Sequence, residues 1–152
     1  MNKYSIILIL FFSNISYAES DFDHILLRDK IVDDSFNVVD LKQFDKLLRD
    51  VNANISSILP TQTDANTTIH SMVISRFGIF ANYQLAEVNT TKDAEYVFFH
   101  MGVLQRMKNF LCSSQFVKSK TIKNLNYSFN INLVNEDNEI IFNSKIPVKE
   151  CD

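Results

Sequence analysis

Few side chains in this sequence are of the kinds that carry out catalysis or bind a metal ion. The three histidines, His24, His70 and His100, lie far apart along the chain. No HExxH, GxSxG, P-loop, GxGxxG or CxxC pattern occurs. A zinc site needs three or four ligands at workable spacing, and no such group stands out. We therefore predict no catalytic residue, no metal site and no cofactor.

Carboxylate pairs are the remaining catalytic candidates. Two carboxylates about 5–10 Å apart can hydrolyse a glycosidic bond. Asp93 and Glu95 form one such pair in sequence, but they stand at the start of a predicted helix, where negative charge is favourable in itself. An enzyme would have to gather two or more of His70, His100, Asp93 and Glu95 in one pocket.

The N-terminus has the pattern of a cleavable signal peptide, residues 1–18. Lys3 precedes a short apolar run, and the small residues Ser16 and Ala18 stand before a cleavage site between Ala18 and Glu19. The run is shorter than the ~20 residues of a membrane-spanning helix, although an N-terminal anchor is the alternative. We expect a periplasmic or secreted protein with no membrane span in the mature chain, in which residues 19–152 form a single globular α+β domain.

The chain contains two cysteines, Cys112 and Cys151. In an oxidising compartment a lone pair usually forms a disulfide. A reactive thiol or a metal site is the alternative, but neither cysteine has a histidine near it in the sequence. We predict a disulfide, which would close a loop of about 40 residues.

Charge is unevenly distributed along the chain. The formal net charge is −3, which argues against general binding of nucleic acid. Residues 96–135 contain no acid, whereas residues 19–50 are strongly acidic. The basic residues of the former segment are Arg106, Lys108, Lys118, Lys120 and Lys123. This basic segment either contacts an anionic partner or pairs with the acidic first helix inside the fold, and both interpretations stay open.

The periodicity of the first half predicts a helix and a hairpin. Apolar residues at steps of three and four predict a helix over residues 36–58, which ends before Pro60. Residues 61–66 are predicted to be a polar loop. Two β-like runs, 67–76 and 78–87, meet at Gly78 and predict a hairpin.

The second half repeats the order of a helix and then a hairpin. Thr90 and Asp93 resemble a capping box, and a central helix is predicted to run to about residue 111, because apolar residues cover most of its circumference. Apolar and polar residues then alternate over 124–133, which predicts a half-buried strand. Pro147 indicates that the return strand is an edge.

The outer face of the predicted strand over residues 124–133 would be a row of amides. Its members are Asn124, Asn126, Ser128, Asn130 and Asn132. Such a row either hydrogen-bonds a glycan or a protein, or is a solvated sheet surface. Together with the basic segment it forms the candidate interaction surface. The members of this surface are Arg106, Lys108, Lys118, Lys120, Lys123, Asn124, Asn126, Asn130 and Asn132.

The element order α-β-β-α-β-β predicts an α+β fold. We expect a four-stranded, mostly antiparallel sheet with two helices packed on one face and one disulfide. The chain also resembles a loose group of small exported bacterial proteins. The resemblance is carried by Leu59-Pro60, Asp64, Thr67-Thr68, Tyr83, Cys112, Tyr127 and a terminal hairpin that closes on Cys151. It implies an envelope or secreted location and no particular reaction.

Three hypotheses for the function follow. The first is a non-enzymatic exported protein that binds another protein in the envelope or outside the cell, for instance an accessory of a secretion or pilus system. The second is a periplasmic immunity protein that inhibits a toxin through an exposed acidic or aromatic protrusion. The third is a secreted hydrolase or effector.

Overall fold

The computed structural model describes residues 21–151. The predicted signal peptide and its cleavage site lie outside this part of the chain and stay predictions. In chain order the elements are α2 (Asp21–Arg28), α3 (Leu41–Ser56), β1 (Thr61–Asp64), β2 (Thr67–Ser75), β3 (Gly78–Leu85), α4 (Thr91–Glu95), the π-helical turn η1 (Tyr96–His100), α5 (Val103–Ser113), α6 (Gln115–Lys118), α7 (Lys120–Asn124), β4 (Ser128–Val134), β5 (Ile140–Pro147) and the 3-10 turn η2 (Val148–Cys151).

The sheet is mixed and has five strands in the order β1-β2-β3-β4-β5, not the four that we predicted. The additional strand, β1, lies in the segment predicted to be a loop and pairs with the start of β2. Its side chains are polar and mostly exposed, so no alternation of apolar residues marks it in the sequence. Only backbone pairing with β2 makes it a strand.

One pair of neighbouring strands, β3 and β4, is parallel, and the other pairs are antiparallel. A parallel pair needs a crossover connection, which the helices α4 to α7 provide between residues 86 and 127. The predicted hairpin of β2 and β3 is confirmed, and β5 lies at the edge of the sheet as Pro147 indicated. A Cβ atom on Gly78 would lie 2.4 Å from the carbonyl oxygen of Ser128, so only glycine fits where β3 begins beside β4.

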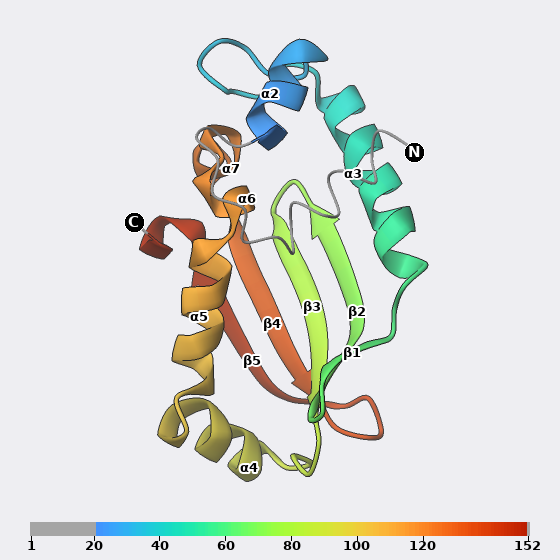
Figure 1. Cartoon of the computed structure of the whole chain (residues 1–152), viewed down its shortest axis with the longest axis vertical. Coiled ribbons are helices and arrows are strands. Elements are labelled where there is room, and N and C mark those ends of the chain that lie inside the picture. The colour runs from blue at the N-terminus through green and yellow to red at the C-terminus, as the bar shows by residue number, and fades with distance from the viewer. Residues whose placement is uncertain (1–20, 152) are drawn as a thin grey trace.

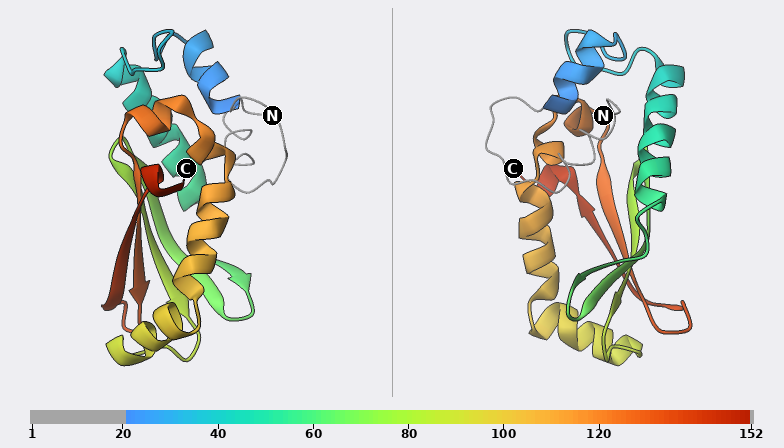
Figure 2. Two further views of the ribbon diagram at one scale, coloured as in Figure 1. Left: turned by 90° about the vertical axis from the view of Figure 1, so that its left-hand side faces the viewer. Right: turned by 45° about the vertical axis from the view of Figure 1, so that its right-hand side comes forward.

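The two long helices, α3 and α5, lie on the same face of the sheet (Figures 1 and 2). α3 packs against β2, and α5 runs along the β5 side of the sheet (Figure 1). The buried side chains Phe44 and Val51 of α3 join Ile74, Ile79 and Ile131 of the sheet in one core. The α+β class therefore agrees with the prediction, and α3 and α5 lie on one face as expected. The number of helices does not agree, because the shorter helices α2, α4, α6 and α7 were not predicted as separate elements.

The first long helix begins later than we predicted. Phe36 has a positive φ of 63°, and the neighbouring Val32 and Val38 form an isolated bridge. Asp40 is the N-cap, and its side chain accepts a hydrogen bond of 2.9 Å from the N–H of Gln43. Capping therefore starts the helix at Leu41 instead of residue 36.

The predicted second helix is interrupted. The helix is capped by Thr90 as expected, but it passes into η1 and then breaks at Gly102, which has a left-handed φ of 66°. α5 resumes in a new direction (Figure 1), and none of its residues is fully buried. The prediction of one continuous central helix was therefore wrong, because its apolar residues belong to two segments that face different neighbours.

The alternation that predicted the third strand is confirmed on its buried side. Tyr127, Phe129, Ile131 and Leu133 are each at most 4% exposed. The strand itself begins only at Ser128. Asn124 is in α7, and Asn126 has a positive φ of 52° in the following turn, so neither amide is part of the strand's outer face.

Burial of two tyrosines predicts how stability changes at high pH. Loss of solvation raises the pKa of Tyr127 and of Tyr83, and the Tyr127 hydroxyl donates to the carbonyl oxygen of Ser75. An unfolded tyrosine ionises near pH 10, so the unfolded chain loses these protons first and stability should fall as the pH rises above about 10. Ultraviolet titration should show fewer tyrosinates in the folded than in the unfolded protein. Complete ionisation without unfolding would contradict this.

Candidate interaction surface

The structure divides the predicted interaction surface among three places. Arg106 and Lys108 are on α5. Lys118 ends α6, and Lys120, Lys123, Asn124 and Asn126 are in α7 or just after it. Asn130 and Asn132 are on β4, which lies between β3 and β5 in the sheet. The nine residues therefore do not form one continuous surface.

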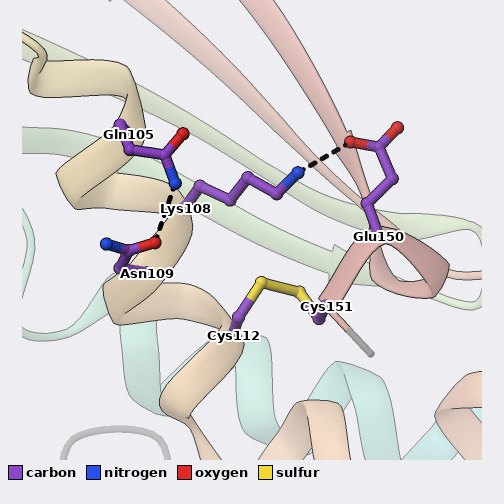
Figure 3. A network of polar contacts seen from close by, with 6 residues as sticks. All are labelled: Gln105, Lys108, Asn109, Cys112, Glu150 and Cys151. Atoms are coloured by element: carbon purple, nitrogen blue, oxygen red, sulfur yellow. Dashed lines mark hydrogen bonds and ion pairs between the residues drawn. A yellow bond between two sulfur atoms is a disulfide. The ribbon is translucent and has the colours of Figure 1, made fainter.

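The disulfide anchors the C-terminal turn η2 to α5. Cys112 and Cys151 are bonded, as predicted, and one helical turn before Cys112 the Lys108 ammonium lies 3.0 Å from a Glu150 carboxylate oxygen (Figure 3). Gln105 and Asn109 form a further hydrogen bond of 2.8 Å on the same helix. Lys108 is thus already paired with an acid of its own chain, although not with the acidic first helix.

Part of the remaining basic segment is engaged by the acidic N-terminal region. The buried Asp23 carboxylate accepts hydrogen bonds from the Ser119 hydroxyl at 2.6 Å and the Lys120 N–H at 2.8 Å. The Lys120 ammonium lies 4.7 Å from the ring centroid of Phe36, and the Asn124 side-chain amide donates to the Ser35 carbonyl oxygen at 3.0 Å. These contacts pack α7 against residues 21–40, and none of them joins it to α3, the first long helix, with which the basic segment was expected to pair.

The most exposed apolar side chains near the basic segment lie along η1 and α5. Tyr96, Phe99, Met101 and Phe110 are 60%, 63%, 53% and 57% exposed. The Arg106 guanidinium donates to the Met101 carbonyl oxygen at 2.7 Å, and Phe110 lies one turn after Arg106 on the same face of α5. We call these five residues the η1–α5 ridge.

The ridge was missed in the sequence because its aromatic residues were predicted to be core. Phe98 is the inward member of η1: it is 2% exposed and stacks on Phe142 with ring centroids 4.4 Å apart. Its neighbour Phe99 contacts Phe142 only edge-on, at 5.8 Å. Gly102 is the one feature of the sequence that could have indicated a break between η1 and α5, and with it that aromatic residues of these two segments are exposed.

The residues required for a hydrolase are not gathered in a pocket. The His70 ring nitrogen lies 2.6 Å from the Gln84 side-chain oxygen on the sheet. Asp93, Glu95 and His100 are exposed on α4 and η1. Among residues 21–151 no group of three or more His, Cys, Asp or Glu side chains is placed to hold a metal ion. Over the same residues no helix has the length and apolar character needed to cross a membrane.

Comparisons with known proteins support a fold for this chain and assign it no function. No family model and no curated protein matches the sequence. A presumed secreted protein of Pseudomonas aeruginosa has a similar structure, with a TM-score of 0.53 and 9% identity over 72% of this chain and 94% of its own. The chain is therefore an α+β protein that shares its fold with a small secreted bacterial protein, in agreement with the resemblance seen in the sequence.

Two type II secretion pilotins also match, at lower similarity. EpsS of Vibrio vulnificus has a TM-score of 0.46 and 13% identity over 73% of this chain and 94% of its own. AspS of Vibrio cholerae has a TM-score of 0.42 and 12% identity over 83% and 99%. At these scores the likeness carries no argument about function.

Proposed function

We propose that this protein is a small exported, non-enzymatic protein that binds another protein through the η1–α5 ridge. The observations that carry the proposal are the exposure of Phe99 and Phe110 and the hydrogen bond by which Arg106 of α5 contacts the Met101 carbonyl oxygen at the end of η1. Aromatic residues and arginine are the residue types that supply most binding energy at protein interfaces. The one charged residue of the ridge is Arg106, so a partner with an acidic group beside an apolar centre fits the ridge.

The compartment follows from the predicted signal peptide. Export would place the ridge in the envelope or outside the cell, and the Cys112–Cys151 disulfide is the kind of bond that persists there. Within this class we carry forward an accessory of a secretion or pilus system as the first candidate. A toxin inhibitor is the second candidate, because an exposed aromatic protrusion is what such a protein presents to its target.

Site-specific photo-crosslinking in the producing cells tests the proposal and captures the partner in the same step. A photoreactive phenylalanine analogue is placed at Phe99 or at Phe110, and the matched control carries it at Phe77. Phe77 is 69% exposed and lies in the β2–β3 turn, at the end of the sheet away from α4 (Figure 1). We expect one discrete protein adduct from the two ridge positions and none from the control.

The identity of the cross-linked protein decides between the two candidates. A secretion or pilus component supports the first, and a toxin supports the second. The variant F99A/F110A should weaken retention of the identified partner at least tenfold, because each aromatic anchor is worth more than about 1 kcal/mol. Equal adducts from Phe77 and from the ridge, or unchanged retention by the variant, would contradict the proposal.

A further inference from the structure

The face of the sheet opposite α3 and α5 carries an ordered set of uncharged polar side chains. The strand registers align two rows across β2, β3, β4 and β5 on this face. The first row is Ser71, Asn82, Asn132 and Asn143, and the second is Val73, Phe80, Asn130 and Lys145. Among the described elements no helix lies over these rows (Figure 2). We call them the amide face.

The central amides of this face are held in place by one another and by the backbone. The Asn132 side-chain nitrogen donates to the Asn82 side-chain oxygen at 3.0 Å. The Asn130 side-chain nitrogen donates to the Ile79 carbonyl oxygen at 3.3 Å. A carboxamide has two N–H donors and an oxygen that accepts twice. The Asn82 donors and the Asn132 oxygen therefore keep hydrogen-bonding capacity toward a ligand.

Beside the amides lies a small apolar surface. Val73 and Phe80 are directly opposite each other on β2 and β3, and they are 52% and 43% exposed. The two rows carry no carboxylate, and their one charge is Lys145 on the edge strand. A sheet surface that combines fixed amides, a half-exposed aromatic ring and almost no charge matches a ligand rich in neutral hydroxyl groups.

We propose that the amide face binds a neutral oligosaccharide. Hydroxyl groups both donate and accept, as the carboxamides of Asn82, Asn132 and Asn143 do, and Phe80 offers its ring to the C–H face of a sugar. The four strands of a row span about 14 Å, which accommodates a short oligosaccharide lying across them. A protein partner would instead require a more apolar centre, and that is found on the η1–α5 ridge, so this site is independent of the proposed function.

Nuclear magnetic resonance titration of the intact, oxidised protein tests the site. The probes are three neutral ligands: a chitooligosaccharide, a maltooligosaccharide and a cellooligosaccharide. We expect at least one of them to shift the side-chain NH₂ signals of Asn82 and Asn132 saturably. N82A/N143A should weaken that binding at least tenfold, since two hydrogen bonds are lost, and F80A should weaken it similarly.

Two controls keep the result unambiguous. N143A alone alters an exposed residue of the edge strand, so it tests the site even where the double variant is less stable, and it should weaken binding about threefold or more. F110A alters an exposed ridge residue of α5 and should leave sugar binding unaltered, while it weakens binding of the protein partner. Absence of saturable shifts with all three sugars, shifts confined to other surfaces, or equal affinity in N82A/N143A would overturn the proposal.

Discussion

Replacement of both Cys112 and Cys151 by serine is expected to lower the free energy of unfolding by about 3–4 kcal/mol. The two residues are 39 apart in sequence, and in the chain-entropy model a loop of this length greatly restricts the unfolded ensemble. The bond also has a local role, because it fixes η2 beside α5 and thereby holds Val148, which is 1% exposed, in the core. Denaturant unfolding of C112S/C151S and of the wild-type protein gives the difference.

The neighbouring ion pair provides the matched control. Lys108 and Glu150 bridge the same two elements (Figure 3), but their side chains are 30% and 51% exposed, and an ion pair of that kind contributes at most about 1 kcal/mol. K108Q should therefore have a small effect. Reduced wild-type protein should unfold at the same denaturant concentration as C112S/C151S. Equal stability of the oxidised and reduced proteins would show that the disulfide does not stabilise this fold.

The second large effect is expected at Asp23. This carboxylate is 5% exposed and joins α2 to α7, which lies almost a hundred residues later. It accepts from the Ser119 hydroxyl, the Lys120 N–H and, at 3.3 Å, the Thr121 N–H. Ser119 and Thr121 are both 0% exposed, so their donors would be buried without a partner once the carboxylate is removed.

We expect D23A to lower the free energy of unfolding by about 3 kcal/mol, because hydrogen bonds to a charged group are worth more than neutral ones and unsatisfied buried donors are costly. D23N should lose less, since its amide oxygen still accepts. D21A is the control: Asp21 is exposed in the first turn of the same helix, where a carboxylate contributes about 0.3–1 kcal/mol. Thermal and denaturant unfolding measure all three variants. An equal effect of D21A and D23A would contradict the role of Asp23 in joining α2 to α7.

Several features could be predicted from the sequence because they depend on local order. The alternation of apolar residues from Tyr127 to Leu133 assigns the buried side of β4, since successive strand residues point to opposite faces. The stripe from Phe44 to Ile55 assigns the buried side of α3 in the same way. Pro147 places its strand at an edge because proline lacks an N–H. The pairing of Cys112 with Cys151 followed from their number and the predicted compartment.

Features that depend on residues distant in the chain could not be predicted. β1 is a strand only because β2 offers it a backbone to pair with, and its polar residues carry no periodic signal. Nothing in the sequence distinguishes Asp23 from the other acids around it. It accepts hydrogen bonds from residues 119–121 only because α7 packs against α2. The candidate interaction surface was divided because neighbours in sequence, such as Lys108 and Lys118, belong to helices that end and turn between them.

By itself, then, the sequence determined which class of fold this chain adopts, which sides of α3 and β4 are buried, and that its cysteines pair. Periodicity and residue chemistry depend on a few neighbouring positions, so these features can be predicted without a structure. Only the tertiary structure decided which aromatic residues remain outside the core. Phe98 is buried and Phe99 is exposed because the chain turns at Gly102 and because Phe142 of β5 packs on Phe98. Neither the direction of this turn nor the position of Phe142 can be predicted from the residues around Phe98 and Phe99.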